Sequence, residues 1–162
     1  MNDSMPPPTL GLNARKTAKT LGWLGVIPFI ALTASSALGG PQWAEQALIA
    51  YGALILSFMA GTLWSDLIHA TRTPRNANAH LLASNGLVLM AWPALWFPMA
   101  WASWWLAALF TAHLVLDAPW LPNNGPAWYR HMRLGISTVV ITLLVLSGAV
   151  GLGIEFGLGN AG

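Results

Sequence analysis

Five long apolar runs constrain this sequence more than any other feature. The runs cover residues 21–38, 47–67, 81–97, 99–116 and 134–156. An α-helix rises about 1.5 Å per residue, so about 20 apolar residues are needed to cross a hydrocarbon layer about 30 Å thick. Each run is therefore predicted to be a transmembrane helix. The expected fold is all-α, an integral membrane bundle of five transmembrane helices.

The composition supports a lipid environment. Hydrophobic residues make up 56% of the chain and charged residues only 7%, whereas a soluble domain has about 25% charged residues. A chain with so little charge cannot cover a globular surface in water, so most of its outside must face lipid. We expect one five-helix transmembrane domain over residues 20–158. A flexible cytoplasmic segment, residues 1–19, is expected before it, because this segment has too little apolar content to be buried.

The positions of the basic residues predict the orientation. All seven basic residues lie before the first run, between the second and third runs, or between the fourth and fifth runs. They are Arg15, Lys16, Lys19, Arg72, Arg75, Arg130 and Arg133. Basic residues near span ends are retained on the cytoplasmic side. The N-terminus is thus predicted inside and the C-terminus outside, in a multi-pass protein of a bacterial inner (cytoplasmic) membrane.

Tryptophan, which prefers the headgroup layer, gives an independent test of this orientation. On the predicted topology, Trp23, Trp64, Trp120 and Trp128 line the inner interface, and Trp43, Trp92, Trp96 and Trp101 line the outer one. Trp104 and Trp105 lie deeper, where they either pack in the bundle or line a pocket.

The first run has a second interpretation. Basic residues followed by an apolar stretch and the small residues 34–37 also resemble a secretory signal with a cleavage site. The length of the run favours a retained helix, and Gly25 with Pro28 indicates a kink of the kind that membrane helices tolerate.

Small residues four positions apart allow membrane helices to approach closely. Three such pairs occur, Ser57 with Gly61, Ser147 with Gly151 and Gly153 with Gly157. They predict that the second and fifth spans are central to the bundle.

Histidine and aspartate gather near the predicted inner face. Asp66 and His69 are three residues apart on the second span, and His113 and Asp117 are four apart on the fourth, so each pair shares a helix face. Three interpretations stay open: ion pairs with nearby arginines that fix the loops, a proton or ligand path, and a metal or haem site. No cofactor is predicted, and haem or a metal ion at His69 and His113 is the alternative.

Several stretches resemble the transmembrane-protein-69-like family of small multi-span membrane proteins. They are residues 21–29, residues 51–58 with Gly61 and Trp64, and Asp117 with residues 126–133. This family has no established function. The resemblance implies the site residues Tyr51, Ser57, Trp64, Asp117, Trp128, Tyr129 and Arg133, with an ion pair between Asp117 and Arg133. The chain departs from the family pattern at Asp66, where a small residue is common.

Two functional hypotheses follow. The sequence has no glycine-rich phosphate loop, no nucleophile elbow and no HExxH pattern, so the first hypothesis is a non-enzymatic accessory or assembly factor that contacts a membrane-protein partner or forms a homo-oligomer. The second is a binder or transporter of a small hydrophobic ligand, porphyrin- or sterol-like, with a pocket among Trp64, Trp104, Trp105 and His113. It rests on an architectural resemblance to the tryptophan-rich sensory and translocator proteins. The lipid bilayer is the expected surrounding, and a net charge of +2 gives no reason to expect a nucleic-acid partner.

Overall fold

The computed structural model describes residues 11–68, 77–117 and 127–159, without the side chains of 65–68 and 154–159. This part of the chain is helical apart from short connections. Its elements are α1 (Leu12–Leu24), α2 (Ile27–Ala37), α3 (Gln42–Ile68), α4 (Ala77–Ala91), the 3-10 helix η1 (Trp92–Trp96), α5 (Met99–Asp117) and α7 (Ala127–Gly159).

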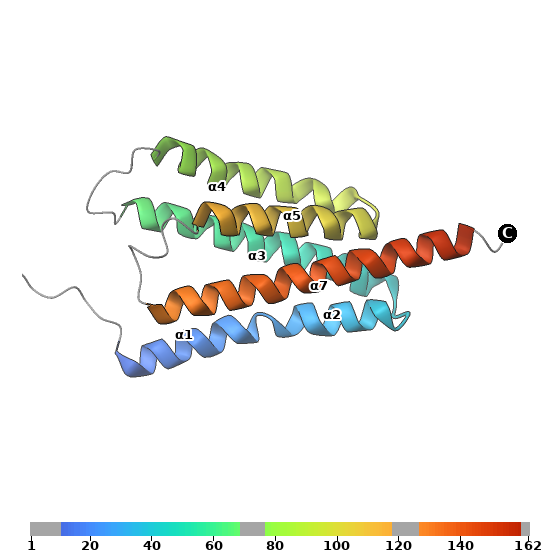
Figure 1. The fold of residues 1–162 in the computed structure, drawn as a ribbon, viewed down its shortest axis with the longest axis horizontal. Coiled ribbons are helices and arrows are strands. Elements are labelled where there is room, and N and C mark those ends of the chain that lie inside the picture. The colour runs from blue at the N-terminus through green and yellow to red at the C-terminus, as the bar shows by residue number, and fades with distance from the viewer. Residues whose placement is uncertain (1–10, 69–76, 118–126, 160–162) are drawn as a thin grey trace, which may run out of the picture.

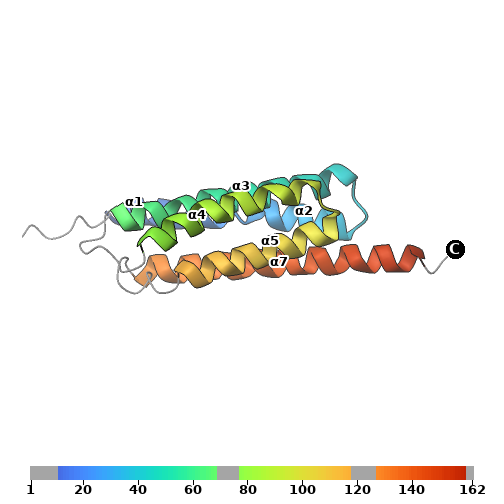
Figure 2. The same ribbon diagram turned by 90° about the horizontal axis from the view of Figure 1, so that it is seen from above.

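The helices lie side by side along one long axis (Figure 1). Seen from above, α5 and α7 form one layer, and α3 and α4 lie in the other (Figure 2). The helix α3 packs against α2, α4 and α5, and α7 packs against α5, α2 and α1. At one end of the bundle, α1 and α7 begin and α3 and α5 terminate. We call it the basic end, because Arg15, Lys19 and Arg133 lie there.

Four stretches are long and apolar enough to cross a membrane, Leu12–Ala37, Gln42–Trp64, Met99–Asp117 and Ala127–Gly153. They correspond to the first, second, fourth and fifth predicted spans. The protein is therefore a multi-pass membrane protein with an all-α fold.

The third predicted span, residues 81–97, differs from the others. Its α-helix, α4, is only 15 residues long and ends at Ala91, where the chain tightens into the five residues of η1. Pro93 lies in the first turn of η1, and proline supplies no N–H for an α-helical hydrogen bond. The change of helix type is therefore encoded at this position.

The N-terminal boundary corrects one prediction. Residues 1–19 are expected to be flexible, but α1 already begins at Leu12. The stretch after Gly11 contains Ala14, Arg15, Lys16, Ala18 and Lys19, which are strong helix formers. Hydropathy alone cannot detect this extension because the added turns are polar. Residues 1–10 lie outside the described residues.

The predicted kink in the first span is confirmed. The helix α1 ends at Leu24, α2 begins at Ile27, and Pro28 lies in the first turn of α2. The hydroxyl of Tyr51 on α3 donates a hydrogen bond to the carbonyl oxygen of Gly25 within the break, at 2.9 Å. This contact satisfies a backbone acceptor in lipid, where an unpaired carbonyl is costly.

The helix α2 ends in a tight turn at Gly39. Its φ of 72° lies in the left-handed region that favours glycine. The amide of Gly39 donates to the carbonyl of Ser36, and the amide of Gly40 donates to the carbonyl of Ser35. This Schellman arrangement pairs the last carbonyls of the helix and sends the chain back into α3.

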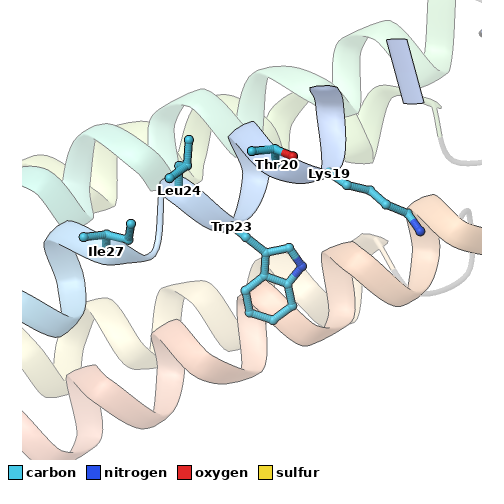
Figure 3. A pocket seen from close by; sticks show the side chains of 5 residues that line it. All are labelled: Lys19, Thr20, Trp23, Leu24 and Ile27. Atoms are coloured by element: carbon cyan, nitrogen blue, oxygen red, sulfur yellow. The ribbon is translucent and has the colours of Figure 1, made fainter. Parts of the chain in front are cut away.

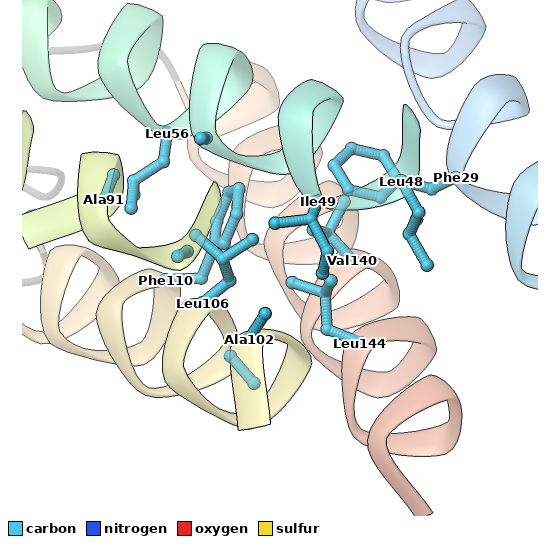
Figure 4. Close-up of a cluster of buried hydrophobic side chains, with 13 residues drawn as sticks. Phe29, Leu48, Ile49, Leu56, Ala91, Ala102, Leu106, Phe110, Val140 and Leu144 are labelled. Carbon is cyan, nitrogen blue, oxygen red and sulfur yellow. The ribbon is translucent and has the colours of Figure 1, made fainter. Parts of the chain in front are cut away.

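The core lies where α2, α3, α5 and α7 meet. Its largest fully buried apolar side chains are Phe29, Leu48, Leu56, Leu106, Phe110, Val140 and Leu144 (Figure 4). The ring of Phe29 contacts the rings of Tyr51 and Phe110, at centroid distances of 5.0 and 6.3 Å. The aromatic cluster thus connects three helices.

One of the three predicted small-residue pairs lies at a close helix contact. A Cβ atom on Gly151 would lie 3.0 Å from the Cβ of Ala100, and the hydroxyl of Ser147 is 3.4 Å from that of Ser103. The helices α5 and α7 therefore approach closely through small residues. A Cβ atom on Gly61 would meet nothing within 4 Å. Gly153 is equally open, and the side-chain surroundings of 157 lie outside the described part.

Candidate functional site

A buried ion pair lies at the basic end of the bundle. The guanidinium of Arg133 on α7 contacts the carboxylate of Asp117 at the end of α5. The two side chains are only 6% and 1% exposed. Charges removed from water are costly unless they are paired, so each of these residues depends on the other. The ion pair expected from the sequence is present.

The guanidinium of Arg133 makes further hydrogen bonds to two helices. Its Nη1 donates to the hydroxyl of Tyr129, one turn earlier on α7, at 2.7 Å. Its Nη2 donates to the hydroxyl of Thr62 on α3, also at 2.7 Å. The Thr62 hydroxyl in turn donates to the carbonyl of Met59. Arg133 therefore connects α3, α5 and α7 through directed contacts.

His113 completes this cluster. Its Nε2 is 3.4 Å from Nη2 of Arg133, and the imidazole also has a hydrogen bond to the backbone of Met59 on α3. The side chain is 1% exposed. Each of these side chains has at least one polar partner within the cluster, which rigidifies a site of low dielectric constant. We call Thr62, His113, Asp117, Tyr129 and Arg133 the arginine cluster.

An apolar cavity of about 460 Å³ adjoins this cluster. Thr62, Tyr129 and Arg133 contribute to its wall, and the rest of the lining is largely apolar. The apolar lining comes from α1, α2, α3 and α7 and includes Leu21, Phe29, Ile55, Phe58, Met132, Ile136 and Val140. The side chain of Phe58 is 75% exposed, so this cavity reaches the lipid-facing surface.

Comparison with known proteins identifies the family. Residues 14–149 match the model of a family described as protein of unknown function (DUF3429). The chain belongs to this family. It is also 30% identical over 137 residues to transmembrane protein 69 of Xenopus tropicalis, which confirms the resemblance noted from the sequence. The match covers 82% of this chain and 54% of the relative, so the chain spans about half the length of that protein. No solved structure matches.

Two of the site residues that the family resemblance implies make structural contacts away from the arginine cluster. Tyr51 pairs with the carbonyl of Gly25 in the helix break. The hydroxyl of Ser57 donates to the carbonyl of Ala53 in its own helix, at 2.8 Å. Neither contact positions a group for chemistry. Trp64 is 43% exposed at the basic end.

Trp128 lies at the beginning of α7 and contacts α1. The guanidinium carbon of Arg15 is 5.2 Å from the centre of its ring, and the ammonium nitrogen of Lys19 is 5.9 Å from it. These are cation–π distances. The contact brings basic residues that precede the first span onto an aromatic residue that precedes the fifth, and sequence separation conceals this proximity.

The structure does not describe the side chains of two predicted site residues. The side chain of Asp66 and the whole of His69 lie outside the described residues. Within the described side chains, no group of three or more His, Asp or Glu residues could hold a metal ion. The alternative of a metal or haem at His69 and His113 is therefore not tested.

The residues of the aromatic pocket predicted among Trp64, Trp104, Trp105 and His113 lie in separate surroundings. His113 is buried in the arginine cluster, whereas Trp104 on α5 lies against the backbone of Gly148. The indole N–H of Trp105 donates to the carbonyl of Met90, at 2.7 Å, and its ring contacts Phe97. Thr62 was not among the predicted site residues. The cavity beside Arg133 had no signal in the sequence.

Proposed function

We propose that this protein is a non-enzymatic accessory or assembly factor of a bacterial inner membrane, acting through helix contacts with a membrane-protein partner. The observation that carries the proposal is the arginine cluster. Its acidic, basic and imidazole side chains satisfy one another between three helices. A catalytic acid or base needs access to a substrate proton, whereas the side chains of His113 and Asp117 are each only 1% exposed and serve to fix helix positions.

We further propose five membrane crossings with the N-terminus on the cytoplasmic side. The 15 residues of α4 and the five of η1 extend over about 22 and about 10 Å at the usual rises. Together they match a hydrocarbon layer of about 30 Å. Arg15, Lys16, Lys19, Arg130 and Arg133 all lie at one end of the bundle, which supports placing that end inside.

Reporter fusions test this topology. A reporter after Gly162 should be active on the periplasmic side, and one inserted at Arg75 should be active in the cytoplasm. Activity on the same side at both places would contradict five crossings.

The experiment for the accessory role is purification of the full chain from its own membrane in a mild detergent, followed by native mass spectrometry. We expect the chain to be found with other polypeptides in fixed stoichiometry. A chain released alone, with a small hydrophobic molecule bound, would contradict the proposal and favour the second candidate.

The second candidate is a binder of a small hydrophobic ligand, and the cavity of about 460 Å³ favours it. Ala18 on α1 contributes to the cavity wall, so Ala18→Leu should reduce the space and displace a resident molecule. Ala34→Leu, at an exposed position on α2, is the matched control. An absorption spectrum of the purified protein would detect a porphyrin directly, and equal retention by both variants would exclude this cavity as the binding site.

A further inference from the structure

Two grooves adjoin on the surface of the bundle, one between α1 and the beginning of α7 and one along α1 and the first residue of α2. The first, about 490 Å³, is lined by Arg15, Lys19, Trp23, Trp128, His131 and Met132. The second, about 380 Å³, is lined by Lys19, Thr20, Trp23, Leu24 and Ile27. Lys19 and Trp23 line both, so the two form one groove that changes from basic to apolar. We call it the α1–α7 groove.

The basic part of the α1–α7 groove concentrates positive charge. Arg15 and Lys19 both lie within cation–π distance of the Trp128 ring. Among the acidic side chains that the structure describes, Asp117 pairs with Arg133 and Glu45 lies at the opposite end of the bundle. Neither lines the α1–α7 groove. Two cations held beside one ring, with no acidic residue in the lining, favour an anionic occupant.

The apolar part of the α1–α7 groove follows α1 to the first residue of α2, toward the middle of the bundle. The Trp23 ring lies over Gly135 on α7, at 3.5 Å from the position of a Cβ atom. Trp23, Leu24 and Ile27 are 48%, 49% and 54% exposed. Figure 3 shows Trp23 and Lys19 directed from α1 toward α7, with Leu24 and Ile27 farther along the chain. These residues offer an apolar path that continues from the basic part.

We propose that the α1–α7 groove binds one anionic phospholipid. The phosphate lies between Arg15 and Lys19 beside Trp128, and an acyl chain lies along Trp23, Leu24 and Ile27. Basic pockets between membrane helices on the cytoplasmic side have the chemistry for such headgroups. A zwitterionic lipid also carries a phosphate, but its ammonium group would be repelled by the two cations. The inference rests on the membrane-spanning fold and is independent of the accessory role.

Native mass spectrometry of the full chain in mild detergent tests the binding. The chain is titrated with phosphatidylglycerol and with phosphatidylcholine of the same acyl composition. We expect one phosphatidylglycerol to be retained, at a half-saturating concentration about tenfold lower than that of phosphatidylcholine. Equal retention of the two lipids would overturn the proposal.

Charge variants locate the site. Removing one cation near a membrane surface weakens anionic lipid binding about fivefold, so Arg15→Gln with Lys19→Gln should raise the half-saturating concentration more than tenfold. Lys16→Gln is the matched control with one charge removed, because Lys16 is exposed and lines neither part of the α1–α7 groove. We expect it to change binding less than twofold. A loss with Lys16→Gln equal to that with Lys19→Gln alone would show that only net charge matters and would overturn the proposal.

A competition experiment distinguishes a lipid from a free phosphate as the occupant of the α1–α7 groove. Glycerol phosphate, which has the headgroup chemistry without acyl chains, should not displace phosphatidylglycerol at equal concentration. Displacement would indicate a soluble anion and contradict a lipid site. Thermal melting of each variant verifies folding, and the comparison of the two lipids on the unaltered chain holds whether or not a variant folds.

Discussion

Arg133 and Asp117 form a buried ion pair that joins the beginning of α7 to the end of α5. Arg133 also donates hydrogen bonds to Tyr129 and to Thr62 on α3, so one guanidinium holds three helices in register. Removal of one member of a buried pair leaves an uncompensated charge. The interior of this membrane bundle therefore depends on a small set of polar contacts. Substitutions at these residues should reveal how much each contact contributes to the free energy of unfolding.

Thr62 is expected to contribute through both of its hydrogen bonds. Thr62→Val keeps the shape of the side chain but removes the acceptor for Arg133 and the donor to Met59. An unsatisfied buried donor costs about 1–3 kcal/mol, and more for a charged group, so the free energy of unfolding in detergent should fall by at least about 1 kcal/mol. Thr62→Ser retains the hydroxyl and should recover most of the loss. Equal loss in both variants would show that the methyl group matters and the hydrogen bonds do not.

Tyr51 is expected to stabilise the break between α1 and α2. Tyr51→Phe removes the hydrogen bond to the carbonyl of Gly25 and retains the ring contact with Phe29. The expected loss in the free energy of unfolding is about 1 kcal/mol. Ser57→Ala is the control, because the Ser57 hydroxyl bonds only to the carbonyl of Ala53 in its own helix. A larger loss in the control than in Tyr51→Phe would contradict this role.

Gly151 and Gly61 should respond differently to a larger side chain. Gly151→Leu forces α7 away from Ala100, where a Cβ atom would already lie at 3.0 Å, and overpacking of this kind costs about 1–3 kcal/mol. A Cβ atom added at Gly61 would meet nothing within 4 Å, so Gly61→Leu should leave the stability of the isolated chain nearly unchanged. Thermal melts in one detergent compare the two. Loss of a co-purifying partner with Gly61→Leu, without loss of stability, would place that partner on α3.

The sequence predicted the helices well and their ends poorly. Apolar runs long enough for a membrane mark four of the spans directly. The polar first turns of α1 carry no hydropathy signal, so Leu12 could not be recognised as a helix start. The third span was expected to be one continuous helix, but Pro93 changes it to a 3-10 helix after Ala91.

The arginine cluster was predictable only in part. Asp117 and Arg133 flank one short connection, so their pairing follows from the order of the helices. The contacts of Arg133 with Thr62 and of His113 with Met59 depend on how α3 packs against α5 and α7. One of these contacts uses a backbone group, which no sequence pattern marks. The contact of Arg15 with Trp128 could not be predicted for the same reason, because it requires the first and last helices to pack side by side.

A double-mutant cycle on the ion pair tests the structural role of the arginine cluster most directly. Asp117→Asn should lower the free energy of unfolding by about 1–3 kcal/mol, because it leaves Arg133 buried without its counter-charge. Arg133→Gln should cost at least as much, since it also removes the hydrogen bonds to Tyr129 and Thr62. The unfolding free energies of both single variants and the double variant are measured in one mild detergent. We expect the double variant to lose less than the two single losses combined, with a coupling of at least about 1 kcal/mol. Strictly additive losses, or unchanged stability accompanied by loss of ligand binding or proton flux, would contradict a structural role for the pair.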